Sequence, residues 1–357
     1  MRVHEVVEFG SPLIEVDQEE PTPQGTEVLV EVISSGVCHT DLHLQDGYYS
    51  LGGGKRSNLA DRGIVPPLVL GHEVLGRVIA AGPDAGLPAG DGSTFVVYPW
   101  LGCGHCAECL RGDENLCATP KSIGVARPGG YAERLLVPHP RYLVPADGLD
   151  PDLAATYACS GLTAYSAVTK AAIDRENDLL LIIGLGGVGF NGLLLARALG
   201  FQRIAAADID PGKRALAEAL GGVLVLDPSD EGAAGALAEA GGVAAAVDFV
   251  GMPTTSAFAV SSLRKGGICI VVGLFGGALA LDLPPLVQRS LTVRGSYVGT
   301  LDELKQLVEL ARTGRLQPLP VEQVPFDDVN SALDRLRAGG VAGRLVLTTA
   351  AHAEAGR

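Results

Sequence analysis

Four cysteines lie within fifteen residues of this chain and restrict what the segment around them can fold into. Two, two and seven residues separate them in the order Cys103, Cys106, Cys109 and Cys117. Hydrophobic packing does not require thiols at such intervals, whereas four thiolates fill every position around a tetrahedral Zn²⁺ ion. The intervening Gly104 and Gly112 favour turns, as backbone that wraps round an ion requires. The spacing therefore predicts a closed structural zinc site in the loop 103–117.

A pair of disulfides is the alternative interpretation of this segment. Disulfides need an oxidising compartment, and the N-terminal stretch Met1–Glu5 carries no apolar signal segment. The chain has seven cysteines, an odd number, which also favours metal ligation over complete pairing. We therefore expect zinc in this loop and a reduced, cytoplasmic protein.

Length and charge argue against several classes of protein. At 357 residues the chain is too long for one ordinary core, so two domains are expected. Its formal net charge of −14 argues against nucleic acid or an anionic membrane surface as a partner, because a phosphate backbone is bound by basic surface. No apolar run approaches the roughly eighteen residues of a membrane span.

The pattern of the sequence changes near residue 178. Before it, short strands such as 28–32 and 74–79 alternate with turns rich in proline and glycine. After it, the continuous apolar run at 179–183 is typical of a strand buried on both faces, and a helix pattern follows at 187–199. Further elements are expected, with strands at 203–207, 223–226, 245–249 and 268–272, a helix at 301–312 and a last strand at 344–347.

This alternation predicts an α/β protein in which a doubly wound parallel sheet is inserted into a β-rich domain. We expect the β-rich domain at 1–155 and 295–357 and the inserted domain at 156–294. The cleft between the two domains is the natural place for an active site.

A glycine motif stands directly between the buried strand and the helix that follows it. Its residues are Gly184, Leu185, Gly186, Gly187, Val188 and Gly189. In a strand–turn–helix setting the first glycine permits a tight turn, the second admits a pyrophosphate, and the third lets helix and strand pack closely. The free N–H groups of the helix N-terminus favour the phosphate charge. The motif therefore predicts a dinucleotide site.

Asp208 ends the next strand, at about the 20-residue distance expected of the acidic residue that binds the adenosine ribose. A carboxylate there accepts hydrogen bonds from ribose hydroxyls and repels a 2′-phosphate, which predicts NAD rather than NADP. The alternative is that Asp208 only caps a strand. Lys213 is either a further contact to the ribose or a solvated lysine, and Arg214 is the nearby residue that could weaken the preference for NAD.

Three further candidate metal ligands lie outside the four-cysteine loop, namely Cys38, His72 and Cys159. Taken singly, a buried cysteine is most often an inert small hydrophobe. Taken together, two thiolates and one imidazole form the ligand set of a catalytic zinc, whose fourth position takes water or substrate. Spacing alone does not establish this site, because the three residues are far apart in the chain.

The order of these motifs resembles that of zinc-dependent medium-chain alcohol dehydrogenases over essentially the whole chain. The motifs are Cys-His-Thr-Asp-Leu-His at 38–43, Gly-His-Glu at 71–73, the four-cysteine loop, the glycine motif and Gly-Arg at 343–344. The resemblance implies a GroES-like catalytic domain split around a Rossmann domain. It also implies NAD, two Zn²⁺ ions per subunit, and reversible oxidation of an alcohol to an aldehyde or ketone with hydride transfer to NAD⁺.

The same resemblance implies how the catalytic metal is held. Cys38, His72 and Cys159 match the ligands of the catalytic zinc, while the four-cysteine loop holds the structural one. Asp41 and Glu73 match acidic residues just behind the metal, where such carboxylates orient the ligands.

Further roles follow from the resemblance for the residues around the substrate and the cofactor. Thr40 matches the hydroxyl that hydrogen-bonds the alcohol, and His43 matches the histidine that carries the proton toward solvent. His39 and Arg344 match contacts of the cofactor pyrophosphate. Thr163 lies where the nicotinamide is contacted.

The stretch 48–63 departs from family members with a short pocket. It is longer than their equivalent loop, and its triple glycine permits loop motion. It lies between two candidate zinc ligands in the sequence, so we expect it to overhang the substrate channel. Tyr48, Tyr49 and Trp100 are candidates to narrow the pocket, the alternative being ordinary packing between the domains. Three cations of the stretch either meet an anionic substrate or are simply solvated, namely Lys55, Arg56 and Arg62.

Several rival functions are weighed against a dehydrogenase of simple alcohols. Polyol, other secondary-alcohol or hydroxyacyl-CoA dehydrogenases belong to the same superfamily, but many polyol members carry a glutamate where this chain has Cys159. Zinc-free quinone or enoyl reductases are disfavoured by both cysteine sets, and a noncatalytic NAD-binding protein by the presence of Thr40 and His43. The family also suggests a homo-oligomer that extends its parallel sheet through the edge at 290–298, with a tetramer favoured over a dimer.

Overall fold

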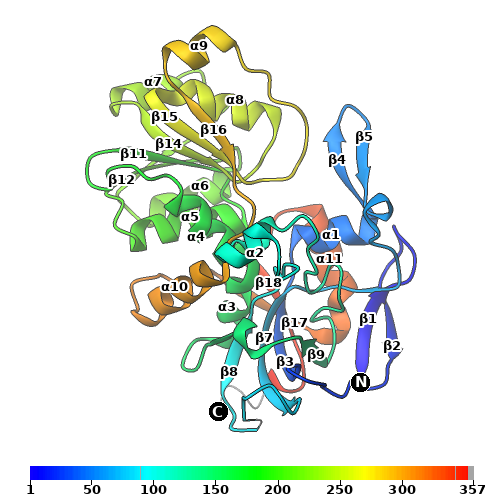
Figure 1. Cartoon of the computed structure of the whole chain (residues 1–357). Helices are drawn as coiled ribbons and strands as arrows, with labels where there is room; N and C mark the ends of the chain where they lie inside the picture. Colours follow the sequence, from blue (N-terminus) through cyan, green and yellow to red (C-terminus); the bar gives the residue numbers. More distant parts are fainter. Residues whose placement is uncertain (89, 342, 353–357) are drawn as a thin grey trace.

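The computed structural model describes residues 1–88, 90–341 and 343–352, and it consists of two lobes that are each built on a β-sheet (Figure 1). The chain starts in the lower lobe of that view, passes through the upper lobe and returns to the lower one. None of the described helices is long and apolar enough to cross a bilayer.

The upper lobe contains a six-stranded, wholly parallel sheet in the order β13-β12-β11-β14-β15-β16. Its strands are β11 (Leu179–Ile183), β12 (Arg203–Ala207), β13 (Val223–Leu226), β14 (Val243–Asp248), β15 (Leu263–Val271) and β16 (Thr292–Gly295). The helices between them are α5 (Gly187–Ala198), α6 (Pro211–Ala219), α7 (Ala233–Glu239), α8 (Pro253–Ser262) and α9 (Leu283–Gln288). This is the strand–helix alternation of a Rossmann fold.

Strand β11 forms where the sequence predicts it because the apolar run 179–183 is buried along its whole length. The observed bounds of β12 and β13 also agree with the prediction. Strand β15 begins at Leu263, five residues before the predicted start at 268. Its first half, Leu-Arg-Lys-Gly-Gly, is partly exposed and has no apolar pattern, so the sequence gives no signal for it.

The lower lobe is built on a seven-stranded sheet with the order β10-β8-β7-β3-β18-β17, in which β9 also pairs with β3. Its strands are β3 (Val28–Gly36), β7 (Glu73–Ala81), β8 (Thr94–Val97), β9 (Arg134–Val137), β10 (Leu143–Pro145), β17 (Val321–Pro325) and β18 (Arg344–Thr348). A smaller sheet, β2-β1-β6, comprises β1 (Arg2–Val6), β2 (Ile14–Asp17) and β6 (Leu68–Val69). The remaining helices are α1 (His39–Asp46), α2 (Ala107–Arg111), α3 (Pro151–Thr156), α4 (Leu162–Thr169), α10 (Leu301–Arg312) and α11 (Val329–Ala338).

The last strand of the chain completes the sheet that the first part of the chain begins. Strand β18 pairs antiparallel with β3, so that Val346 lies opposite Gly36 and Thr348 lies opposite Ser34. The Rossmann sheet is therefore inserted within a β-rich lobe, and the predicted fold class is confirmed.

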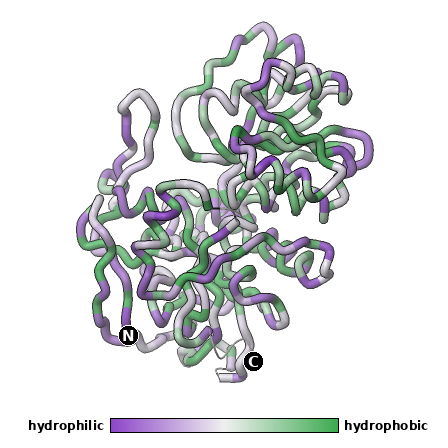
Figure 2. The backbone as a smooth tube through the Cα atoms, turned by 180° about the vertical axis from the view of Figure 1, so that it is seen from behind, coloured by the Kyte–Doolittle hydropathy of each residue, from purple (hydrophilic) through white to green (hydrophobic). Residues whose placement is uncertain are grey.

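The stretch 48–63 is a β-hairpin rather than the flexible loop that the sequence suggested. Strand β4 (Tyr48–Gly52) pairs with β5 (Lys55–Asn58) and a short 3₁₀ turn, Ala60–Arg62, follows. Figure 2 shows this hairpin mainly in white and purple, so most of its residues are hydrophilic or of intermediate hydropathy. The hairpin contacts the Rossmann lobe, because a Cβ on Gly52 would lie only 2.6 Å from the Cα of Gly277.

Candidate metal centres and active site

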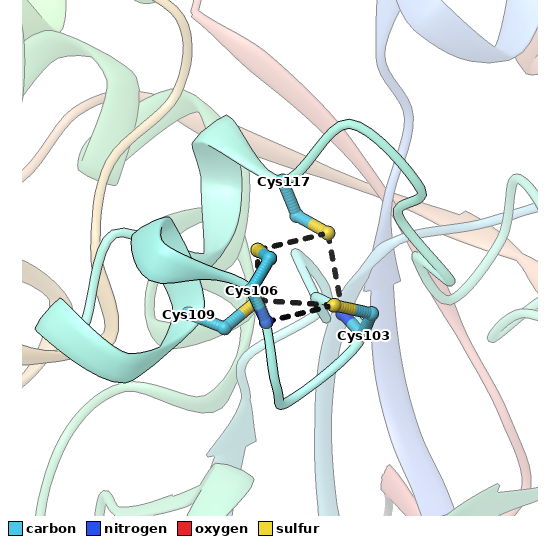
Figure 3. Close-up of side chains that lie close together, drawn as sticks. All are labelled: Cys103, Cys106, Cys109 and Cys117. Carbon is cyan, nitrogen blue, oxygen red and sulfur yellow. Dashed lines mark hydrogen bonds between the residues drawn. The ribbon is translucent and has the colours of Figure 1, made fainter.

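The four cysteines of the loop 103–117 point toward one another (Figure 3). Their sulfur atoms all lie within 4.8 Å of one another, and all seven cysteines of the chain are free, so the disulfide alternative does not form. The backbone N–H of Cys103 donates to Cys117 Sγ at 3.3 Å, and that of Cys106 donates to Cys103 Sγ at 3.4 Å. Backbone N–H donation from His105 lowers the pKa of Cys103 to about 6. Four sulfurs that accept such bonds fit a closed zinc site.

Glu114, which the sequence gave no reason to select, anchors this loop to the sheet. Its buried carboxylate accepts hydrogen bonds from the backbone N–H of Gly102 at 3.0 Å and from the hydroxyl of Tyr142 at 2.8 Å. It also forms an ion pair with Arg141 at 2.9 Å. The loop is therefore held at both the sulfur cluster and this carboxylate.

A second cluster of ligand atoms joins three distant segments. Cys38 follows β3 and begins α1, His72 directly precedes β7, and Cys159 lies in a π-helical turn, Tyr157–Gly161, between α3 and α4. Their ligand atoms and one oxygen of Glu73 all lie within 4.8 Å of one another, and all four residues are buried. Single π-helical turns are frequent at functional sites. The structure thus brings together the three residues whose proximity the spacing alone could not establish.

Asp41 holds the imidazole of His72. Asp41 Oδ1 lies 3.2 Å from His72 Nδ1, and Oδ2 accepts hydrogen bonds from the backbone N–H of Cys38 at 3.0 Å and from the hydroxyl of Tyr131 at 2.9 Å. Although burial acts to lower it, the Asp41 carboxylate raises the pKa of His72. A carboxylate behind a ligating imidazole fixes the orientation of the ring.

The second ring nitrogen of His72, Nε2, shows whether the cluster can accept a metal ion. Among the described residues, His72 Nε2 has no hydrogen-bond partner, although the ring is fully buried. An unpaired buried nitrogen is costly unless another ligand takes it. A hydrogen bond with Cys159 lowers the pKa of Cys38, which favours the thiolate that a metal requires. Two sulfurs and one free imidazole nitrogen fit zinc with one position open.

A buried ion pair connects this cluster to the glycine motif. Glu73 Oε2 lies 2.5 Å from Arg344 Nη2, and Glu73 Oε1 accepts a hydrogen bond from the backbone N–H of Ser160 at 3.0 Å. A Cβ on Gly187 would lie 2.8 Å from Arg344 Cδ, so the arginine packs against the start of α5. Arg344 Nε has no partner among the described residues. Arg344, which the resemblance assigns to the cofactor pyrophosphate, thus also binds Glu73, a contact that no motif predicts.

The glycine motif has the geometry that its sequence suggests. Gly184 has a φ of 84°, in the left-handed region that favours glycine. A Cβ on Gly189 would collide with the carbonyl oxygen of Gly184. A Cβ on Gly186 would meet nothing within 4 Å, so this turn faces open space. Val188 is half-buried in the first turn of α5. The N-terminus of α5 is therefore accessible to an anionic ligand.

Asp208 lies at the end of β12 beside this motif. Its Oδ2 accepts a hydrogen bond from the backbone N–H of Leu185 at 2.6 Å, and its Oδ1 accepts one from Asp210 at 2.8 Å. Each carboxylate oxygen can accept a second bond, so a ribose contact is compatible with this position. Lys213 is half-buried on α6. Arg214 is bound to Asp227 at 2.8 Å, which occupies the cation that could have favoured a 2′-phosphate.

The residues assigned to the proton path lie on α1. Thr40 and His43 are both partly exposed and are three residues apart, so they share one face of the helix. The rings of His43 and Tyr49 are 4.6 Å apart, and the rings of His39 and Phe275 are 6.1 Å apart. Burial lowers the pKa of both histidines. Thr163, on the first turn of α4, is half-buried.

A chain of aromatic rings leads away from the second cluster. The ring of Trp100 lies 5.4 Å from His72 and 5.9 Å from Tyr297, and its Nε1 donates a hydrogen bond to the carbonyl of Ala158 at 3.0 Å. Trp100 is therefore packed against the second cluster, but it is not among the lining residues of the cavity beside Tyr297, and its role in narrowing a pocket stays a prediction. Tyr48 does not line the cavity described next, since Arg56 stacks over its ring at 3.9 Å.

A cavity of about 610 Å³ lies between the two lobes, at the outer end of these rings. Its walls come from the hairpin, from the cysteine loop and from the loops that follow β14 and β15. Among its lining residues are Tyr49, Arg62, Asn115, Met252, Leu274 and Tyr297. The sequence points to Tyr49 but not to Met252, Leu274 or Tyr297, because these three lie in irregular segments without a motif.

Comparison with known proteins agrees with this architecture. The family of alcohol dehydrogenase GroES-like domains matches residues 24–148, and the zinc-binding dehydrogenase family matches residues 187–313. An NAD-dependent alcohol dehydrogenase of Saccharolobus solfataricus is 33% identical over 97% of this chain and 99% of its own. A D-arabinose 1-dehydrogenase (NADP(+)) of the same organism is 32% identical over 95% of both chains.

A solved structure gives the same result in three dimensions. The alcohol dehydrogenase of the archaeon Aeropyrum pernix superimposes with a TM-score of 0.85 at 29% identity, over 98% of this chain and 100% of that one. The lobes and the two ligand clusters define a zinc-binding dehydrogenase with a GroES-like domain. The chain belongs to the zinc-dependent alcohol dehydrogenase family of medium-chain dehydrogenases.

Proposed function

We propose that this protein oxidises an alcohol reversibly to an aldehyde or ketone and transfers the hydride to NAD⁺. The observation that carries this proposal is the buried cluster of Cys38, His72 and Cys159, whose free imidazole nitrogen lies among two sulfurs next to the nucleotide-binding turn. The Saccharolobus relative named as an NAD-dependent alcohol dehydrogenase supports both the reaction and the cofactor.

Two zinc ions per subunit fit the chain. Cys38, His72 and Cys159 would hold the catalytic ion, and the cysteines of the loop 103–117 would hold the structural one. When bound, the catalytic zinc lowers the pKa of an alcohol and NAD⁺ supplies the hydride acceptor. The chain's own contribution is to fix the imidazole of His72 through Asp41 and to shield the three ligands from bulk solvent, since each is at most 8% exposed.

Thr40 and His43 would move the proton. We assign to Thr40 the hydrogen bond with the reacting hydroxyl and to His43 the transfer of the proton to solvent, because His43 is partly exposed on the same face of α1. Burial lowers the pKa of His43, which keeps its imidazole neutral and able to accept a proton near neutral pH. A His43→Gln variant should lose rate mainly on the acid side of its pH profile, where solvent bases are scarce. An unchanged profile would contradict the assignment.

The cofactor would lie across the carboxyl ends of the parallel strands. We assign the pyrophosphate to the turn Gly184–Gly189 together with His39 and Arg344, and the nicotinamide to the neighbourhood of Thr163. Arg344 supports this assignment because it packs on Gly187 with a free Nε.

Asp208 would bind the adenosine ribose, with Lys213 as the second contact, and would favour NAD over NADP. The engagement of Arg214 with Asp227 supports this preference. The choice between NAD and NADP needs a direct test, because one relative is named as a D-arabinose 1-dehydrogenase (NADP(+)). Comparable kcat/KM values with NAD⁺ and NADP⁺ would contradict the assignment of Asp208.

Simple alcohols are our first candidate substrates, and sugars or polyols are the second. The thiol of Cys159 supports the first class, whereas the arabinose-oxidising relative favours the second. Formation of NADH over a panel of alcohols, diols and aldoses tests both, and preference for an aldose over every simple alcohol would reverse this order.

The domain boundaries, the assembly and the compartment are also proposals. We assign 1–155 and 295–357 to the catalytic domain and 156–294 to the dinucleotide domain, with 89, 342 and 353–357 outside the described residues. A homotetramer, rather than a dimer, built partly on the edge at 290–298 is supported by exposed apolar side chains near that edge, Leu283 and Val287. Seven free cysteines support a reduced, cytoplasmic setting.

The deciding experiment compares the same substitution, cysteine to serine, at two buried cysteines. Cys38→Ser should abolish NADH formation and remove one zinc per subunit, while Cys269→Ser should keep both activity and zinc, because Cys269 is buried in β15 and belongs to neither cluster. Metal content is measured on the same samples as activity. Full activity of Cys38→Ser, or equal loss in both variants, would overturn the proposed function.

A further inference from the structure

The 610 Å³ cavity between the lobes is lined by one positively charged side chain that has no carboxylate partner in the described part of the chain. Arg62 is the only lining residue, among those that the structure describes, that bears a full formal charge. It is exposed to this space and no described carboxylate forms an ion pair with it. The chain has a net charge of −14, so carboxylates outnumber cations. An arginine that lines a pocket without a described carboxylate partner is therefore available to bind an anionic ligand.

The other two cations of the same segment are arranged differently. Arg56 stacks over the ring of Tyr48 at 3.9 Å, and Lys55 lies at the exposed tip of the hairpin. Neither of them lines the cavity. The short 3₁₀ turn that carries Arg62, in contrast, returns toward the cavity wall formed by Tyr49 and Ser57.

Arg62 lines the same cavity as the aromatic residues Tyr49 and Tyr297. The Arg62 guanidinium acts against the rise that burial causes in the pKa of Tyr49 and of Tyr297, which places it near both phenols. Tyr49 contacts His43, and Tyr297 leads through Trp100 to His72. A ligand in this space would lie between Arg62 and the rings of Tyr49 and Tyr297, and Tyr49 is in contact with His43 of the assigned proton path.

We propose that the substrate is an alcohol that carries a single carboxylate, separated from its hydroxyl by an apolar or aromatic segment, and that Arg62 binds this carboxylate. A guanidinium matches the two oxygens of a carboxylate in a planar, bidentate pair. One cation balances one negative charge, and the rest of the wall offers only neutral groups such as Ser57 and Asn115. A phosphate ester, with nearly two charges, would leave part of its charge unpaired.

This inference rests on the proposed function and specifies its substrate. The carboxylate takes no part in the bond changes, since the alcohol carbon gives a hydride to NAD⁺ and the hydroxyl gives its proton to solvent. Arg62 is therefore a specificity residue, and its loss should raise KM for the anionic alcohol more than it lowers kcat.

The test uses two probes of the same shape, para-(hydroxymethyl)benzoate and para-(hydroxymethyl)benzamide, with the zinc-loaded full-length enzyme. The wild type should prefer the carboxylate in kcat/KM by about tenfold or more, and added salt should reduce that preference because Arg62 is exposed. Arg62→Gln should remove the preference and leave the amide within about twofold, while Arg62→Lys should keep part of it. Lys55→Gln removes the same charge from the hairpin without touching the cavity and should keep it fully.

Three results would overturn the inference. They are an Arg62→Gln variant that keeps the preference, equal losses on both probes in that variant, and a preference of the wild type for para-(hydroxymethyl)phenyl phosphate over the carboxylate. In each of these cases the enzyme still oxidises an alcohol, so the proposed function stands. Absence of NADH formation with every alcohol would instead overturn the proposed function and this inference together.

Discussion

The buried pair of Glu73 and Arg344 gives a prediction whose size can be worked out from the structure. The side chains are 0% and 4% exposed, and the two charged atoms are 2.5 Å apart. Arg344→Met keeps most of the apolar stem but leaves the Glu73 carboxylate as an uncompensated buried charge. Removal of one partner of such a pair costs about 3–5 kcal/mol of the free energy of unfolding.

Two variants calibrate this loss. Arg335→Met breaks an ion pair of similar length, 2.7 Å to Glu322, but both side chains are well exposed, so it should cost less than about 1 kcal/mol. The double variant Glu73→Gln with Arg344→Met removes the stranded charge and should recover more than about 1 kcal/mol of the loss caused by Arg344→Met alone. Urea denaturation at constant protein and zinc concentration measures all of these free energies.

The loss should depend on pH in a definite direction. Burial raises the pKa of Glu73 and Arg344 acts against that rise, so removal of the arginine raises the pKa further. A carboxyl whose pKa is raised in the folded state binds a proton more readily there than in the unfolded chain, and stability is then lost as pH rises through the folded pKa. The deficit of Arg344→Met should therefore shrink from about pH 8 toward about pH 5. A deficit below about 1 kcal/mol at neutral pH, or purely additive losses in the double variant, would refute the reasoning.

Three further predictions follow from features of the lobes. Cys103→Ser should leave one zinc per subunit and lower the midpoint of thermal unfolding, and a variant that still binds two ions would contradict the four-sulfur site. Gly189→Ala places a methyl group against the carbonyl of Gly184 and should weaken NADH binding, as followed by NADH fluorescence, at least tenfold more than Gly235→Ala, whose site has open space. His4 is 4% exposed and burial lowers its pKa, so its contribution to stability is complete above about pH 6.5 and declines below it. His4→Gln should flatten that acid slope of the unfolding free energy, and an unchanged slope would show that other groups cause it.

Local motifs made most of the fold predictable. The run 179–183 and the glycines after it determine a strand, a turn and a helix within a few residues, and β11 and α5 form there. The cysteine loop is equally local, since four ligands lie in fifteen consecutive positions. In these cases the sequence itself contains the whole interaction.

Features that depend on residues far apart in the chain were harder to predict from the sequence. Cys38, His72 and Cys159 could be grouped only through the resemblance to a family, because no spacing links them. Glu73 and Arg344 are separated by 271 positions, so their bond has no signature in the sequence. The hairpin at 48–58 was mistaken for a loop because its strands are largely exposed and lack an apolar alternation, and three glycines in a row obscure its turn.

The pairing of β18 with β3 has a consequence for the order in which the lobes fold during translation. The N-terminal lobe lacks a strand until residues 344–348 have been synthesised, and Arg344 is part of that strand. Until then Glu73 lacks its counter-charge, so we expect its carboxylate to stay in water although β7 can already pair with β3 and β8. The six strands of the Rossmann sheet all lie within residues 179–295, so this sheet can form before β18 completes the lower lobe.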